Sequence, residues 1–214
     1  MQFTGKYISV SYQGVSYTLF NQRSREWTHP YEYQGNGSKL CNAGCGIFST
    51  LHAAQYLGGA CVLTPELADF SCKTGGRGDD GTDRPALLSA MEQAGLARQM
   101  GFSYHGDGLR NNLEALHDAL MQGDGALCNL RPGHIVALIG ARVMDGEKQV
   151  LAADPYSESA DERLRGVIRE CISGSEIVSR ISTPDGIVCG ALQSYALYWA
   201  ALKTVRDFNL LHRL

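Results

Sequence analysis

The apolar residues between Gly44 and Leu57 recur at the spacing of a helix, after a polar and turn-rich stretch at 34–43. The pattern ends at Gly58-Gly59, a glycine signal that commonly stops a helix. Capping signals and leucine stripes predict three more helices. One begins at about 64–66, where Thr64 would cap it and Pro65 would lie in its first turn, and the others cover about 83–94 and about 109–122.

Strand patterns lie near both ends of the chain. Within the first 20 residues, apolar and polar positions alternate on either side of Gln13-Gly14, which predicts a short hairpin. Towards the C-terminus, the polar segment 157–171 predicts a helix. The apolar and aromatic segment 187–202 fits either a final strand or a buried helix, and the pattern alone does not separate the two.

In the middle of the chain, His134 opens an apolar run. A strand is predicted at 126–130, and six apolar or glycine residues then follow His134 without interruption, which is typical of a buried central strand. A second run, 149–153, ends in Asp154-Pro155, with a turn signal at 144–147 between the two runs. His134 faces Asp154 only if the hairpin turns at position 144, so a bulge or a longer loop must bring the side chains level. An aspartate in that place would hold the imidazole tautomer and stabilise the imidazolium.

Cys45 lies between Gly44 and Gly46 at the predicted start of the first helix. There a thiolate would face unpaired backbone N–H groups and the positive end of the helix dipole, which lowers the pKa of a thiol. The flanking glycines let the backbone turn sharply and leave the approach to the sulfur open. A buried cysteine in a glycine turn is the alternative, and it loses support once a base and an orienting group are present.

The composition is typical of a compact soluble enzyme. The 214 residues, 44% of them hydrophobic, suffice for one domain with a substantial core, or for one domain with an appended subdomain. A net charge of -3 without a basic cluster argues against nucleic-acid binding, and the apolar runs are too short for membrane insertion. Residues 1–6 begin no basic and apolar leader. We therefore expect a cytoplasmic protein, or one exported by a route without a standard signal peptide.

The seven cysteines do not resemble a disulfide framework, because their number is odd and their positions are scattered. A reducing compartment is the simpler interpretation. Cys41 and Cys45 are four residues apart, but no second pair at zinc-finger spacing follows. The loop at 74–82 contains an Asp-Asp-Gly sequence that misses the EF-hand spacing, so we expect it to be flexible and solvated. We expect neither a metal nor a cofactor.

Four motifs occur in an order that resembles a known family. The segment from Asn21 to Trp27, then Gly44-Cys45-Gly46, Gly133-His134 and Ala153-Asp154-Pro155 resemble the C39-like cysteine peptidases of the papain-like superfamily. The resemblance covers about residues 20–156. It implies an α+β, papain-like fold, in which an N-terminal helical part with the nucleophile helix packs on a mainly antiparallel sheet. The whole chain, 1–214, would then be a single domain, with 157–214 as an extension of unknown role.

The resemblance also implies a role for each site residue. Cys45 would be the nucleophile, His134 the base and Asp154 the group that orients it. Gln22 would donate to the oxyanion hole, a role that suits a neutral amide, and Trp27 would pack behind it. In the family a proline usually follows the second glycine, where this chain has Ile47. A proline there is favourable but replaceable.

The implied activity is hydrolysis of a peptide bond in a peptide or protein substrate, through a thioester intermediate. The same residues would serve another acyl transfer, such as deamidation, amide hydrolysis or peptide ligation. A peptide-binding module with a degenerate site is the third alternative, against which an intact nucleophile, base and acid argue.

The other histidines are weaker candidates for the base. His52 shares a helix face with Cys45, but two turns separate them by roughly 10 Å along the axis, which is beyond hydrogen-bond reach. The remaining histidines lack a neighbouring strand that ends in a carboxylate, and we expect them to be surface or hydrogen-bonded structural residues: His29, His105, His117 and His212.

Overall fold

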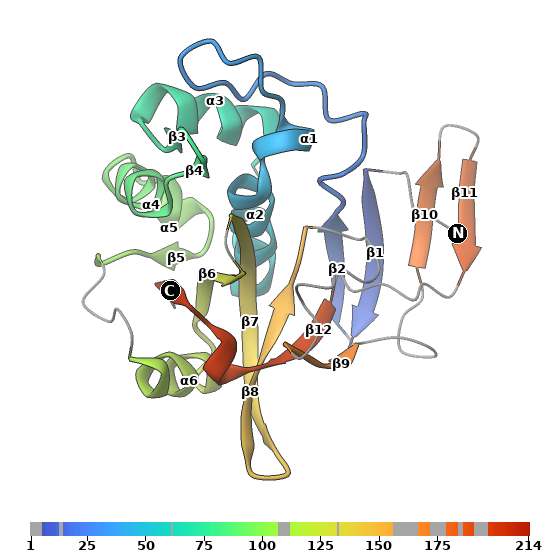
Figure 1. Ribbon diagram of the computed structural model, residues 1–214, viewed down its shortest axis with the longest axis vertical. Coiled ribbons are helices and arrows are strands. Elements are labelled where there is room, and N and C mark those ends of the chain that lie inside the picture. Colours follow the sequence, from blue (N-terminus) through green and yellow to red (C-terminus); the bar gives the residue numbers. More distant parts are fainter. Residues whose placement is uncertain are drawn as a thin grey trace.

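Helices and antiparallel strands alternate along the chain in the computed structural model (Figure 1), which describes residues 6–12, 15–60, 62–106, 112–131, 133–155, 167–171, 179–183, 186–190 and 197–214. The helices are α1 Leu40–Ala43, α2 Cys45–Leu57, α3 Thr64–Thr74, α4 Arg84–Gln93, α5 Leu96–Gln99 and α6 Leu113–Met121, with a 3-10 turn, η3, at Leu202–Thr204. The strands are β1 Tyr7–Tyr12, β2 Val15–Phe20, β3 Arg77–Gly78, β4 Gly81–Thr82, β5 Phe102–Ser103, β6 Gly125–Arg131, β7 His134–Met144, β8 Glu147–Ala153, β9 Ile168–Cys171, β10 Ser179–Thr183, β11 Gly186–Gly190, β12 Leu197–Ala201 and β13 Asp207–Arg213.

The largest sheet has seven strands in the order β5-β13-β6-β7-β8-β12-β9. A second sheet has the order β11-β10-β1-β2, and β3 and β4 form a small ribbon. Every pair among the described strands is antiparallel. Figure 1 shows α3, α4 and α5 on one side of the long β7–β8 hairpin and β1, β2, β10 and β11 on the other side of the view. The predicted α+β class with a mainly antiparallel sheet is confirmed at this level.

Strand β7 is buried on both faces, which explains its unbroken apolar run. Ile135, Ala137 and Ile139 belong to a hydrophobic cluster that includes residues of α2, α3 and α4. Val136 and Leu138 point the other way, into a second cluster that includes residues of α6. A strand covered on both faces needs apolar side chains at every position rather than at every second one.

Helix α2 begins and ends where the sequence predicts. It starts at Cys45, directly after Gly44, and ends at Gly58, whose backbone has the left-handed conformation that glycine adopts without strain. Nearly all its side chains are buried, since it contacts β2, β6, β7 and α3. A helix that is apolar all round is typical of such an enclosed position.

The three helices predicted between residues 64 and 122 also form, with one correction at a cap. Asp83 caps α4 by accepting a hydrogen bond from the backbone N–H of Ala86, at 3.1 Å. In α3 the cap position belongs to Leu63 rather than Thr64, which is the first helical residue and makes no capping bond. Helix α6 begins at Leu113, and residues 107–111, where its start was predicted, lie outside the described part.

The C-terminal segment departs most from expectation. Residues 168–171, predicted as part of a helix, form strand β9, while 156–166 lie outside the described residues. For 187–202 the strand alternative is correct, with β11 and β12 there. Strand β12 pairs with β8, and β13 pairs with β6. Residues far beyond the predicted peptidase motifs therefore complete the sheet that carries them.

The expected flexible loop at 74–82 is instead the β3–β4 ribbon, so that prediction is wrong. Arg77 is buried and holds the ribbon in place. Its Nε donates to the carbonyl oxygen of Tyr31 at 3.0 Å, and its Nη1 donates to that of Gly81 at 2.9 Å. A buried guanidinium with several carbonyl acceptors fixes a short segment that has no apolar pattern of its own.

Gly46 marks the closest approach of this ribbon to α2. A Cβ atom at position 46 would lie 2.4 Å from the Cβ of Thr82, whereas real contacts of this kind exceed 3.0 Å. The hydroxyl of Thr82 is itself held at 2.8 Å from the hydroxyl of Tyr31. The glycine after Cys45 is thus needed because another segment packs directly on the first helical turn.

We expect Gly46→Ala to destabilise the protein by roughly 1–3 kcal/mol, the usual cost of overpacking. Gly140→Ala is the matched control in β7, because a Cβ there would lie 3.7 Å from the Cβ of Leu151, an ordinary contact. The free energy of unfolding from urea titrations measures both effects. Equal stability of the two variants would contradict the close approach.

Candidate active site

Cys45 is the first residue of α2 and is 7% exposed. The first backbone hydrogen bond across the helix start runs from the N–H of Phe48 to the carbonyl of Gly44, at 3.0 Å. The N–H groups of the first turn therefore have no acceptor within the helix and point towards its start. One turn later, Ser49 donates a hydrogen bond to the carbonyl oxygen of Ile135 at 2.9 Å. This bond fixes the start of α2 to the strand residue that follows His134.

His134 and Asp154 form a buried hydrogen-bonded pair, as the hairpin prediction required. The distance from His134 Nε2 to Asp154 Oδ1 is 2.6 Å, and both residues are almost fully buried. The register between β7 and β8 shifts between Leu138 and Ala141, so the irregularity expected in this hairpin is present. Asp154 directly follows β8, and its side chain reaches back to the first residue of β7.

The imidazole of His134 joins Asp154 to Cys45. Its Nε2 faces the carboxylate, and the ring is close enough to Cys45 to lower the pKa of the thiol. Because one ring nitrogen is engaged by Asp154, Nδ1 is the nitrogen that serves the thiol. Cys45, His134 and Asp154 thus lie in the order that a nucleophile, its base and an orienting group require.

Burial acts against both charged partners, raising the pKa of the Cys45 thiol and lowering the pKa of the His134 imidazole. At Cys45 this is outweighed by the hydrogen bond and charge of His134 and by the backbone N–H groups of Ile135 and Gly46, so the pKa falls below its ordinary value. At His134 the charge and hydrogen bond of Asp154, together with Cys45, raise the pKa to about 9. The pair therefore favours thiolate and imidazolium around neutral pH.

Tyr198 is a member of this network that the sequence did not predict. Its hydroxyl donates to Asp154 Oδ2 at 2.8 Å, and the contact is fully buried. Tyr198 lies in β12, beside Ala152 of β8. Of the two alternatives for 187–202, only a strand could put Tyr198 beside β8. The sequence pattern by itself indicates neither the strand that pairs with it nor the register of that pairing.

Gln22 is tied to the same end of the sheet. Its backbone N–H donates to the carbonyl oxygen of Pro155 at 2.8 Å. Trp27 packs behind this segment, donating from its indole to the carbonyl of Asn21 at 2.9 Å, and its ring lies tilted against that of Phe48 in α2 with the ring centroids 5.0 Å apart. The Gln22 side chain is completely buried, and neither atom of its amide has a hydrogen-bond partner among the described residues. Such an amide is costly in the interior of a protein, which makes its position informative.

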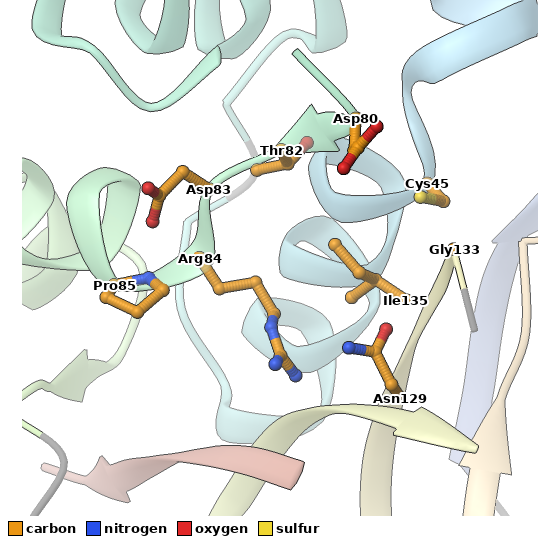
Figure 2. Close-up of a pocket in the computed structure, with 9 residues that line it drawn as sticks. All are labelled: Cys45, Asp80, Thr82, Asp83, Arg84, Pro85, Asn129, Gly133 and Ile135. Atoms are coloured by element: carbon orange, nitrogen blue, oxygen red, sulfur yellow. The ribbon is translucent and has the colours of Figure 1, made fainter. Parts of the chain in front are cut away.

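A cavity of about 440 Å³ opens beside Cys45 (Figure 2). Figure 2 shows Cys45 and Gly133 at one end and Pro85 at the other, with the guanidinium of Arg84 directed towards Asn129. Arg84 is bound by the carboxylate of Asp207 and donates to the carbonyl of Leu127 at 3.1 Å. The lining comes from α2, the β3–β4 ribbon, the start of α4, and β6 and β7: Cys45, Asp80, Thr82, Asp83, Arg84, Pro85, Asn129, Gly133 and Ile135.

His52, the nearest rival in sequence, is a structural residue. Its Nε2 lies 2.8 Å from the backbone N–H of Phe20, so this nitrogen must be the acceptor. Burial lowers the pKa of His52 to about 4 despite the opposing effects of Ala153 and Asp154, which keeps the ring neutral. Three other histidines have their own partners elsewhere: His29 with Asp69, His117 with the carbonyl of Arg142, and His212 with Asp124.

Within the described residues, no three histidine, cysteine, aspartate or glutamate side chains converge as a possible metal site. The helices that the structure describes include none long and apolar enough to cross a bilayer. No protein-family model, no curated protein and no solved structure matches the chain. Membership of the C39-like peptidases therefore stays a prediction.

We expect iodoacetamide at near-neutral pH to label Cys45 first, because its pKa is lowered while desolvation raises the pKa of the Cys72 and Cys128 thiols. Peptide mass spectrometry after short exposures measures the order of labelling. Unfolding in urea should abolish the preference, and Cys45→Ala should lack the fast phase. Faster labelling of Cys72, which is exposed, would contradict the assignment.

Proposed function

We propose that the protein is a cysteine peptidase, which hydrolyses a peptide bond through a thioester on Cys45. The observation that carries this proposal is the buried His134 imidazole, which is hydrogen-bonded to the Asp154 carboxylate and lies close enough to Cys45 to lower the pKa of its thiol. A merely structural cysteine has no need of a charged partner, and burial alone would suppress its thiolate. The adjoining cavity gives a substrate access to the sulfur.

The chemistry follows from this arrangement. The Cys45 thiolate attacks the carbonyl carbon of the scissile peptide, and the electron pair of the C=O bond moves to the oxygen. As the C–N bond breaks, His134 gives its proton to the leaving amine, and a thioester remains. Water then attacks the thioester while His134 takes a proton from it. The new carboxylic acid leaves and the sulfur is released as thiolate beside the imidazolium.

Two donors suit the oxyanion formed in each half of the reaction. The backbone N–H of Cys45 belongs to the first turn of α2, where no intrahelical acceptor exists. The amide of Gln22 is buried, has no hydrogen-bond partner in the described part of the chain, and belongs to a segment bonded to Pro155, next to Asp154. The oxyanion exists only during the reaction. In the free protein, an amide that serves it would therefore have no partner among the described residues.

We also propose the papain-like arrangement for the fold. Its support is the packing of the nucleophile helix α2 on β7, the strand that begins with the base, with Ser49 bonding the two. The cysteines at positions 41, 45, 72 and 128 are free, as a nucleophilic thiol requires, and this favours action in a reducing compartment such as the cytoplasm.

We expect His134→Ala to lower kcat by roughly 10²–10⁴-fold, because it removes both the proton donor and the partner of the thiolate. Asp154→Asn should cost less at neutral pH. It should also move the loss of activity at alkaline pH to lower values, because the Asp154 charge is the main cause that raises the pKa of His134 to about 9.

The substrate can be sought by labelling new protein termini in a proteome treated with the wild type or with Cys45→Ala. Intact substrates with amide groups converted to carboxyls would instead indicate a deamidase.

Gln22→Ala should lower kcat by about a hundredfold, or about 2.7 kcal/mol, with little change in KM. Its stability should hardly fall, since the lost amide makes no hydrogen bond to any residue that the structure describes. Gln55→Ala is the matched control, because that amide bonds the backbone of Thr18 at 2.9 and 3.0 Å. It should lower stability and leave kcat unchanged. The reverse pattern would remove Gln22 from the oxyanion hole.

A further inference from the structure

The carboxylate of Asp154 receives a hydrogen bond on each oxygen. His134 Nε2 lies 2.6 Å from Oδ1, and the Tyr198 hydroxyl donates to Oδ2 at 2.8 Å. Both Asp154 and Tyr198 are buried, at 1% and 0% exposure. With one bond, a carboxylate can turn about its Cβ–Cγ axis, whereas with two the plane of the group is fixed.

Tyr198 reaches Asp154 from the far side of the sheet. In β12 it pairs with Ala152 of β8, and its side chain belongs to the hydrophobic cluster on the face opposite α2. Cys45 belongs to the cluster on the α2 face. Among the described residues, the cavity beside Cys45 is not lined by Tyr198. Its hydroxyl is therefore connected to the thiol through Asp154 and His134.

We propose that Tyr198 is a positioning residue, which holds the Asp154 carboxylate in the orientation that serves His134 and stabilises the negative charge of the site. As a role in catalysis, this rests on the proposed function. This positioning role would assign a function to the C-terminal part of the chain, because Tyr198 lies 44 residues beyond Asp154 and outside the segment that resembles a peptidase.

The sign of the effect follows from charge counting. With thiolate, imidazolium and carboxylate, the site carries one net negative charge, and protonation of Cys45 neutralises it. A hydroxyl that donates to the carboxylate stabilises the charged form, and a fixed carboxylate holds the imidazolium that attracts the thiolate. Loss of the hydroxyl removes both effects, and each raises the pH at which the Cys45 thiolate forms.

The test is the pH dependence of the iodoacetamide reaction at Cys45, which needs no substrate. In Tyr198→Phe the acid-side transition should move upward by about one pH unit, as expected for loss of a hydrogen bond to a charged group. Tyr104→Phe is the control. It removes another buried hydroxyl, which accepts from the amide of Asn209 at 3.2 Å, and should leave the profile unchanged.

Two further variants separate positioning from structural damage. In an Asp154→Asn background, Tyr198→Phe should cause no additional shift, because the hydroxyl acts through the carboxylate. At position 198, 3-fluorotyrosine keeps the ring shape and is a stronger donor, so the transition should move to lower pH even if Tyr198→Phe does not fold.

Profiles of Tyr198→Phe and the fluorotyrosine protein that match the wild type would overturn the proposal. So would a Tyr198→Phe shift that persists in the Asp154→Asn background. If these profiles shift as expected but the wild type cleaves no peptide, the peptidase function fails while the positioning of Asp154 by Tyr198 stands.

Discussion

The buried hydrogen bond between His134 and Asp154 constrains the rest of the structure. Taking two charged groups out of water costs several kcal/mol for each ion, and only close contacts with good geometry offset this. The chain supplies them by placing the start of β7 and the end of β8 side by side, with Cys45 on one side of the pair and Tyr198 on the other. Helix α2 brings Cys45 to the pair and strand β12 brings Tyr198, so the site depends on the positions of both elements.

The apolar part of the fold keeps this polar cluster in place. Strand β7 is covered by α2 on one face and by α6 on the other, so its first residue cannot move without disturbing two hydrophobic clusters. At the same end of the sheet, Gln22 has a buried amide to which the described residues offer no hydrogen bond, and burying such a group opposes folding. Costly polar groups gathered at one end of a well-packed sheet are typical of a site maintained for chemistry rather than for stability.

The parts of the site that could be predicted are those encoded locally. A glycine-flanked cysteine before an apolar pattern identifies a helix start, and two apolar runs around a turn bring His134 near Asp154 by hairpin pairing alone. Tyr198 could not be found in this way, because its position depends on the pairing of β12 with β8. Arg77 was missed for a similar reason: strands of two residues have no periodicity, and its acceptor belongs to Tyr31, 46 residues away.

The division between local and distant contributions has a consequence for assembly. Cys45, His134 and Asp154 lie within the first 154 residues, so α2 and the β7–β8 hairpin can bring them together before β12 pairs with β8. Until then one carboxylate oxygen of Asp154 lacks the Tyr198 hydroxyl, and the imidazolium beside the thiol is less firmly held. Non-local strand pairing is slow to form compared with a hairpin. If β12 supplies the Tyr198 contact that we propose, full activation of the Cys45 thiolate depends on completion of the sheet.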